Sequence, residues 1–431
     1  MKVAAVIAEY NPFHNGHSYQ LQTMRQELGV DYIIVVMSGD FMQRGIPAIM
    51  DKYERCRMAL ENGADIVFEL PVYFSLGSAE YFAVGAVSLL DKLGVVDFLH
   101  FGSECGDIGA LTSCAAILTK ESDTYQYALN KALKEGKSFP AARVIAINST
   151  SKNIPNLENT LSNSGNALDN LLTKPNNILG IEYIKALLQR NSSITPITMN
   201  RSGGEYNSSA LVSGTFASAN AIRELLKNIH SPSNTNPLLA LQEFVPDSIY
   251  HKICNKQTSF VFVDDFSQLL RYKLLCELQK SPNQLSSYYD VTKQLANTFY
   301  KNINRFTTFS DFALICKSKN LTYTRISRCI MHILLDMKQD IIDTLKNNDY
   351  ALYARLLGFN EKGKNILKHI KTNASIPIIT KLPKALKEFD GIALTSLKAD
   401  IYASTIYQSV HAAHMPFPNE LIHEIIKVTA Q

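Results

Sequence analysis

The chain has 431 residues, 46% of them hydrophobic, and a formal net charge of +4. This composition excludes an intrinsically disordered protein, since it supplies enough apolar surface for a folded core, and the length indicates at least two domains. No apolar run approaches the roughly 20 residues of a membrane-spanning helix, so we expect no membrane partner.

The cysteines are scattered, odd in number and without a C-x-x-C pair: Cys56, Cys105, Cys114, Cys254, Cys276, Cys316 and Cys329. Neither a zinc knuckle nor a disulfide framework is therefore predicted. Free thiols are typical of a reducing compartment, and we expect a cytoplasmic protein with reduced core cysteines.

The most informative stretch follows the first predicted strand, at residues 3–8, and reads Glu9-Tyr10-Asn11-Pro12-Phe13-His14-Asn15-Gly16-His17. Apolar residues at helical spacing come next and predict a helix over residues 17–27. In an open α/β sheet, such a strand-to-helix turn lies where ligands bind. Gly16 lets the backbone approach a ligand, and the imidazoles of His14 and His17 add donors to the free N–H groups of the helix. The stretch predicts a phosphate site, although H-x-G-H alone is also compatible with a plain polar loop.

Strands and helices alternate through the first 230 residues. Strand-like runs occupy residues 32–37, 65–70, 98–101 and 194–199, and helical patterns occupy residues 52–62, 79–93, 179–189 and 218–227. This order predicts an α/β fold with a doubly wound parallel sheet. Polar turns at residues 38–45 and 102–104 follow two of these strands, so they should line one pocket together with the first turn.

Two later segments place polar groups at predicted helix starts. In K-P-N-N-I-L-G, either Asn176 or Asn177 contacts a ligand or simply caps the helix. In S-A-N-A-I-R, the hydroxyl of Ser218, the free backbone N–H groups and the guanidinium of Arg223 could converge on phosphate oxygens.

Other nucleotide motifs are missing from the sequence. There is no G-x-x-x-x-G-K-[S/T], which excludes a P-loop enzyme, and no G-x-G-x-x-G after the first strand, which argues against a dinucleotide redox cofactor. No paired carboxylates and no Ser/His/Asp set stand out. The pattern fits phosphoryl chemistry by positioning, which needs donors more than a general base.

The C-terminal part is predicted to be all-helical and basic. Residues 231–238 read as a linker, residues 148–170 as an exposed Asn/Ser-rich loop, and helical patterns occupy residues 266–279, 289–302, 309–318 and 323–336. Residues 240–431 carry 24 Lys and Arg against 17 Asp and Glu, whereas residues 1–239 carry 19 against 22. This asymmetry suggests a polyanion partner, with ordinary solvated surface as the alternative. Two basic clusters stand out: Lys317, Lys319, Arg325 and Arg328 with Tyr323 between them, and Arg355, Lys362, Lys364, Lys368 and Lys371.

The segments E-Y-N-P-F-H-N-G-H, M-S-G-D-F-M-Q-R-G, F-G-S-E, K-P-N-N-I-L-G, S-A-N-A-I-R and R-L-L-G-F-N-E-K-G together resemble one bacterial family. It is the tRNA(Met) cytidine acetate ligase family, within the HxGH nucleotidyltransferase-like superfamily, and the resemblance covers essentially the whole chain. It implies a HUP/nucleotidyltransferase-like, Rossmannoid catalytic domain at residues 1–230, a linker at 231–238 and a helical, tRNA-binding domain at 239–431.

The resemblance also implies an ATP site. The nucleotide-binding stretch of the family maps onto consecutive residues: Ile7, Ala8, Glu9, Tyr10, Asn11, Pro12, Phe13, His14, Asn15, Gly16, His17, Ser18, Tyr19 and Gln20. Later contacts map onto Gly102, Asn176 (or Asn177) and Arg201, with Ser218 helping at the phosphates. His14, His17 and Arg223 are the implied catalytic residues. Asp40 departs from the asparagine expected there, and a carboxylate near a triphosphate would have to turn away or bind a metal.

By the same resemblance, the reaction would use ATP to activate acetate as acetyl-adenylate. Mg²⁺ is expected to assist at the phosphates of ATP. The acetyl group would then pass to N4 of the wobble cytidine of elongator tRNA(Met). A small acetate pocket could be walled by Tyr10, Phe13 and Phe41. Two alternatives remain at this point: a small-molecule adenylyltransferase using the same H-x-G-H site, and an RNA-binding protein that holds ATP as a structural ligand.

Overall fold

The structure is a computed structural model that describes residues 1–137, 139–151, 171–201, 216–228, 237–255, 260–281, 283–319, 321–412, 416 and 418–429. Most of the predicted Asn/Ser-rich loop (152–170) and of the predicted linker (231–236) lies outside these residues. The division into domains 1–230 and 239–431 stays a prediction.

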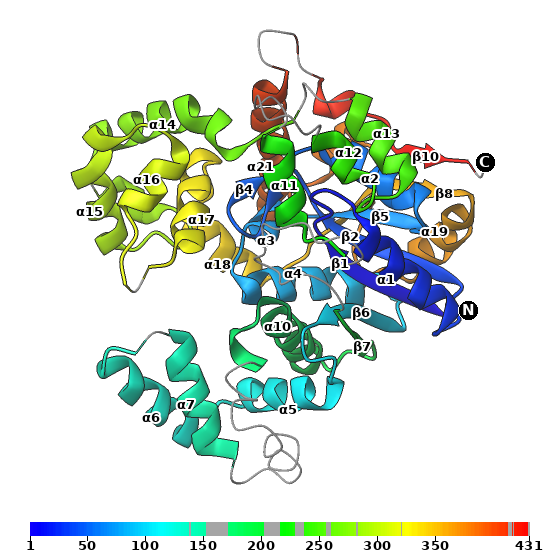
Figure 1. Cartoon of the computed structure of the whole chain (residues 1–431), viewed down its shortest axis with the longest axis horizontal. Coiled ribbons are helices and arrows are strands. Elements are labelled where there is room, and N and C mark those ends of the chain that lie inside the picture. The colour runs from blue at the N-terminus through cyan, green and yellow to red at the C-terminus, as the bar shows by residue number, and fades with distance from the viewer. Residues whose placement is uncertain are drawn as a thin grey trace.

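A mostly parallel sheet forms the centre of the molecule (Figure 1). Its order is β10-β8-β5-β2-β1-β6-β7, with the short β9 paired to β8. The strands are β1 (Val3–Ala8), β2 (Tyr32–Ser38), β5 (Ile66–Leu70), β6 (Phe98–Ser103), β7 (Thr195–Asn200), β8 (Ala354–Asn360), β9 (Ile378–Ile379) and β10 (Ile426–Val428). The five N-terminal strands, β5-β2-β1-β6-β7, are parallel throughout, as the sequence predicts.

Helices cover both faces of this sheet because its strands bury side chains on both sides. Ile34 and Val36 of β2 point into one core, whereas Ile33, Val35 and Met37 point into the other. The first core is closed by helices that include α4 (Ala79–Lys92), α5 (Ile108–Thr119) and α10 (Pro175–Arg190). The second is closed by α1 (Asn15–Gln26), α2 (Lys52–Glu61), α11 (Ala219–Lys227), α12 (Pro237–Leu241) and α13 (Asp247–Asn255).

The remaining helices extend the molecule away from the sheet (Figure 1). Two of them, α6 (Asp123–Lys134) and α7 (Phe139–Ser151), pack mainly on each other. A second helical region, above α6 and α7 at the left of the view, contains α14 (Ser267–Lys280), α15 (Lys293–Asn302), α16 (Phe309–Ile315), α17 (Tyr323–Leu334) and α18 (Gln339–Asn347). Its helices follow the predicted pattern to within a few residues, apart from α18, which the pattern did not indicate. No helix in the described ranges is long and apolar enough to cross a membrane.

After α18 the chain returns to the sheet, so the C-terminal part, which was predicted to be all-helical, also contributes strands. Strand β8 pairs antiparallel with β5, and β10 pairs parallel with β8 at the edge. Between and after them lie α19 (Glu361–Asn373), α20 (Leu382–Glu388) and α21 (Gly391–His411). Strand β8 was not predicted because its second residue, Arg355, looks like part of a basic surface cluster. In the structure Arg355 is only 5% exposed and lies between Glu69 and Glu420.

A short hairpin completes the set of elements near the ends of the first strands. Its arms are β3 (Phe41–Met42) and β4 (Ile46–Pro47), and the single turn α3 (Val72–Ser75) follows β5. Gly45 between the arms has a φ of +74°, a left-handed conformation that glycine adopts without steric cost. The hairpin therefore folds back tightly over the carboxyl ends of the central strands.

Candidate active site

The candidate site lies where the strand order reverses. Strand β1 has β2 on one side and β6 on the other, so the loops leaving β1 and β6 diverge and open a crevice at the carboxyl edge of the sheet. A cavity of about 160 Å³ occupies this position, and a second one of about 80 Å³ adjoins it. Five residues line both cavities: His14, His17, Gln20, Gly102 and Arg201.

The two histidines are held by the start of α1. His14 is the N-cap residue: its Nδ1 accepts a hydrogen bond from Gly16 N–H at 3.1 Å, while Nδ1 of His17 accepts one from His14 N–H at 3.3 Å. The rings stack with their centroids 3.7 Å apart. Because Nδ1 accepts in both rings, a neutral imidazole carries its proton on Nε2. Both residues can therefore donate an Nε2–H to a ligand.

Electrostatics keeps both imidazoles neutral in the unliganded protein. Burial, together with the nearby charges of Arg201 and Arg223, lowers the pKa of His14 to about 3. Burial, His14 and Arg201 together hold the pKa of His17 well below its usual range. The charges of Arg201 and Arg223 give the site a positive potential, which favours a polyanion such as a triphosphate.

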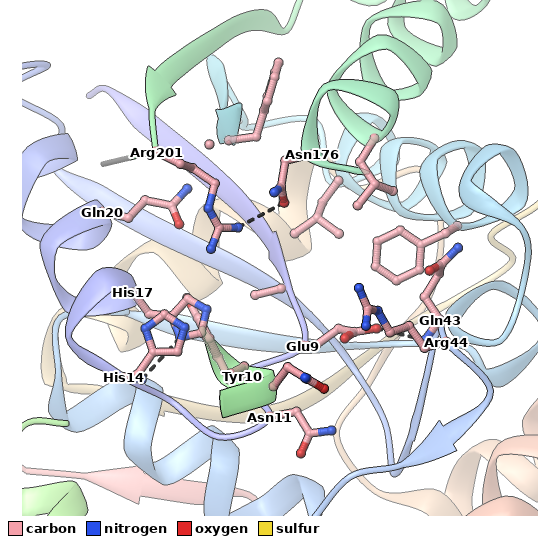
Figure 2. Close-up of a pocket in the computed structure, with 18 of the residues that line it drawn as sticks. Glu9, Tyr10, Asn11, His14, His17, Gln20, Gln43, Arg44, Asn176 and Arg201 are labelled. Carbon is pink, nitrogen blue, oxygen red and sulfur yellow. Dashed lines mark hydrogen bonds between the residues drawn. The ribbon is translucent and has the colours of Figure 1, made fainter. Parts of the chain in front are cut away.

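The opposite wall is built from the ends of β6 and β7 and the start of α10. Nη1 of Arg201 donates to Oδ1 of Asn176 at 2.9 Å, and Figure 2 shows both side chains directed at the cavity. Gly102 is required at this point, since a Cβ there would lie 2.8 Å from Cγ of Arg201. The predicted residues Gly102, Asn176 and Arg201 thus form one wall.

The two asparagines differ in their contacts with the loop after β6. The carboxylate of Glu104 accepts from the backbone N–H of Asn176 at 3.2 Å and of Asn177 at 2.8 Å, so it caps α10. In return, Oδ1 of Asn177 accepts from the N–H groups of Glu104 and Cys105 at 2.9 and 3.1 Å. Asn177 is therefore a structural residue, and Asn176 alone lines the cavity.

The start of α11 adds Arg223 to the site. Nη1 of Arg223 donates to the carbonyl oxygen of Asn11 at 2.7 Å, and Nη2 donates to Oδ1 of Asn220 at 3.2 Å. Ser218 caps the helix by accepting from Ala221 N–H at 3.1 Å, and it lines neither cavity. Arg223 and Asn220 reach the cavity, whereas the role of Ser218 as a ligand stays a prediction.

A buried arginine fixes the turns after β1 and β2. Arg55 on α2 is 0% exposed, and its guanidinium donates to the carbonyl oxygens of Glu9, Ser38 and Gly39. Asp40 turns away from the cavity, because its carboxylate accepts from Lys52 N–H at 2.8 Å and from the hydroxyl of Ser404 at 2.6 Å. Its departure from asparagine therefore places no negative charge on a bound phosphate.

The sequence indicated the hairpin side of the cavity only through the polar turn at residues 38–45. Gln43, Arg44 and Ile46 of the β3–β4 hairpin line it, as do the more apolar Phe82, Phe101, Leu179 and Tyr183. Helix α17 presses on the back of the hairpin, where the hydroxyl of Ser327 donates to Gly45 O at 2.8 Å. Two-residue strands carry too little periodicity to be recognised, so only the polar turn at residues 38–45 signalled this wall.

Several residues of the predicted ATP-binding stretch lie behind the site. Ile7, Ala8, Glu9, Tyr10, Asn11, His14, Gly16, His17, Tyr19 and Gln20 line the cavities, whereas Pro12, Phe13, Asn15 and Ser18 do not. Phe13 is buried against the rings of Tyr10 and His17, and Phe41 packs on Phe266 and Tyr407. Of the three predicted acetate-pocket residues, only Tyr10 reaches the cavity.

Burial leaves fewer surface residues in the two predicted basic clusters. Arg328 and Arg355 are 9% and 5% exposed, which removes them as surface contacts. Arg325 pairs with Asp290 at 2.8 Å. The exposed members are Lys317, Lys319, Lys362, Lys364, Lys368 and Lys371. All seven cysteines are free, as predicted. Within the described residues, no cluster of His, Cys, Asp and Glu could hold a metal ion by itself.

Comparison with known proteins places the chain among nucleotide-using enzymes. A family model described as HIGH Nucleotidyl Transferase matches residues 1–418. Proteins named tRNA(Met) cytidine acetate ligase from Clostridium perfringens and Thermoanaerobacter sp. (strain X514) are 38% and 39% identical, over 99% of this chain and 100% of each relative. A crystal structure of Thermotoga maritima TmcAL bound with alpha-thio ATP matches with a TM-score of 0.85 and 32% identity, over 100% of both chains.

Proposed function

The chain belongs to the tRNA(Met) cytidine acetate ligase family, and on that premise we propose that it is an ATP-dependent ligase that acetylates a tRNA cytidine. The substrate is N4 of the wobble cytidine of elongator tRNA(Met), and the product is N4-acetylcytidine. The observation that supports this most is the pair of neutral, stacked histidines facing Arg201 at the crevice between β1 and β6. This arrangement suits a nucleotide triphosphate.

The first half-reaction joins acetate to AMP. An acetate oxygen attacks the α-phosphorus of ATP, the bond to the bridging oxygen breaks, and pyrophosphate leaves. Nε2–H of His14 and His17 and the guanidinium of Arg223 would donate to the phosphate oxygens as negative charge builds on them. Arg201, Asn176 and Gly102 would hold the nucleotide on the opposite wall. Alignment and charge stabilisation, rather than a general base, carry this step.

Magnesium fits the site only as a partner of the phosphates. Among the described residues that line the cavities, Glu9 is the only carboxylate, so the protein offers no cage of its own. Mg²⁺ usually keeps several waters and binds through substrate phosphates, which suits such a site. We propose that the phosphates of ATP would hold Mg²⁺, and that the ion would supply neutralisation of their negative charge.

Tyr10 is the candidate for holding acetate. It is 1% exposed, lines the larger cavity, and its hydroxyl has no hydrogen-bond partner among the described residues. A buried hydroxyl without a partner is costly, which suggests that a ligand supplies one. We propose that the Tyr10 O–H donates to the acetyl carbonyl or carboxylate oxygen, while the neighbouring rings limit the pocket to a small acid.

The second half-reaction needs an RNA base in the same cavity. The amine N4 of cytosine attacks the acetyl carbon, the carbon–oxygen bond to AMP breaks, and one proton leaves N4. The base must be splayed out of the anticodon loop, as is usual in recognition of single-stranded RNA. The exposed lysines Lys317 and Lys319, in the helical region behind the hairpin, are candidates for contacts with the phosphate backbone.

The test is acetate-stimulated exchange between ATP and labelled pyrophosphate, followed by labelled acetate and a purified tRNA pool. We expect exchange to require acetate, and label to appear only on elongator tRNA(Met), at the wobble cytidine. Exchange stimulated by a phosphorylated cofactor precursor but not by acetate would favour a small-molecule adenylyltransferase. Absence of any exchange would favour a protein that merely holds ATP.

A further inference from the structure

We propose that the carboxylate of Glu9 receives the acceptor amine, so that it recognises N4 of the cytosine and takes the proton that N4 loses. This inference rests on the proposed function and deepens it. Glu9 falls within the stretch expected to contact ATP, and the geometry points to the other substrate.

The first argument is the charge pattern of the cavity. Among the described residues that line it, Arg44, Arg201, Arg223 and the two histidines offer donors to anions, and Glu9 is the only carboxylate. A carboxylate accepts hydrogen bonds and repels the phosphates. In a site built for anions, it suits a part of a ligand that carries N–H groups. The amine of cytosine is such a group, and carboxylates accept from it.

The second argument is how the side chain is held. Oε1 of Glu9 accepts from the backbone N–H of Gln43 at 2.8 Å, which fixes the carboxylate against the β3–β4 hairpin. Its carbonyl oxygen accepts from Arg55 at 2.7 Å, which fixes the backbone. Oε2 makes no hydrogen bond to any described residue. One oxygen is thus anchored and the other is available to a ligand.

The third argument is position. Figure 2 shows Glu9, Gln43 and Arg44 gathered at one end of the cavity, and His14, His17, Arg201 and Asn176 towards the other. The end with both histidines and Arg201 suits the phosphates, and displacement at phosphorus proceeds in line. The acetyl group therefore enters on the side opposite the departing pyrophosphate, which is the hairpin end. An amine that attacks the acetyl carbon approaches from that end.

The step balances without a further reagent. N4 forms a bond to the acetyl carbon, the carbon–oxygen bond breaks, and AMP leaves with the electron pair. The proton from N4 passes to Oε2 of Glu9 and then to solvent. The lone pair of an exocyclic amine is delocalised into the cytosine ring, so a base that accepts its proton as the bond forms is of direct benefit.

Glu9→Gln tests this assignment. The amide oxygen can still accept from Gln43 N–H, but the NH₂ group can accept neither a hydrogen bond nor a proton from the amine. Three rates are measured with the full-length protein: acetate-dependent ATP–pyrophosphate exchange, acetyl-hydroxamate formation with hydroxylamine, and acetylation of tRNA(Met). Hydroxylamine intercepts the activated acetyl group without needing recognition of cytosine. We expect the first two to stay within about threefold of the original, and tRNA acetylation to fall roughly 100-fold.

Glu27→Gln, which removes an exposed carboxylate at the end of α1, is the matched control and should change none of the three rates. A parallel fall of all three rates in Glu9→Gln would place Glu9 on ATP or on Mg²⁺ and overturn the inference, as would undiminished tRNA acetylation. Failure of the proposed function looks different: the original protein would then show no acetate-dependent exchange.

Discussion

The contact between the hairpin and helix α17 gives the sharpest test of this structure. Gly45 has a φ of +74°, and a Cβ at this position would lie 2.4 Å from the backbone nitrogen of Arg328 and 2.5 Å from the carbonyl carbon of Ser327. Both are backbone atoms inside a helix, so no side chain can rotate away. Gly45→Ala must push the hairpin and α17 apart.

The cost has two parts. An alanine in a left-handed conformation costs roughly 1–2 kcal/mol, and overpacking of a tight contact costs about 1–3 kcal/mol more. We expect Gly45→Ala to lower the free energy of unfolding by about 2–5 kcal/mol. Gly29→Ala isolates the first part, because Gly29 has a φ of +59° with no atom within 4 Å of the added Cβ.

Urea denaturation of both variants, followed by far-ultraviolet circular dichroism, measures the difference. At temperatures where both are folded, Gly45→Ala should also lose tRNA acetylation, since Gln43 and Arg44 line the cavity on the same hairpin. If Gly45→Ala is no less stable than Gly29→Ala, the hairpin does not press on α17 as described, and the account of this wall fails.

Three further outcomes are expected. His17→Ala should lower acetate-dependent exchange roughly 100-fold by removing a phosphate donor; a loss of only about twofold would remove His17 from the phosphate site. Burial lowers the pKa of His100 to about 4. Between pH 6.5 and 4 this histidine is therefore protonated in the unfolded chain but not in the folded protein. The free energy of unfolding should fall as the pH is lowered through this range. His100→Gln should therefore reduce this fall, seen in urea titrations at several pH values, by about 1.4 kcal/mol per pH unit, and unchanged slopes would contradict the assignment. Lys52→Met leaves Glu69 and Glu420 buried without their ammonium partner, which should cost about 3–5 kcal/mol in the same assay, whereas exposed Lys384→Met should cost almost nothing.

The parallel part of the sheet and the H-x-G-H turn could be predicted because their signals are local. Apolar runs such as Val3–Ala8 have the length of a buried strand, and the change to helical spacing after His17 marks the start of a helix. The positions of Gly102 and Arg201 follow once those strands are parallel neighbours.

The missing parts depend on partners far away in sequence. The role of Arg355 depends on Glu69, 286 positions earlier, and on Glu420, so its own neighbours gave no sign of a strand. Asn176 and Asn177 could not be separated without Glu104, which caps their helix from another loop. In the sequence, Glu9 is simply one residue of the nucleotide-binding turn. Its contact with the hairpin is visible only in the structure.

The return of the chain to the sheet bears on how the protein is made. During synthesis, β5 emerges early and keeps an open edge until residues 354–360 leave the ribosome. Over that interval Glu69 and Lys52 lack Arg355 and Glu420, and the edge of β5 can pair with other chains. The nucleotide crevice is thus encoded within residues 7–223, yet a nascent chain stopped before β8 would be a poor enzyme and a substrate for chaperones.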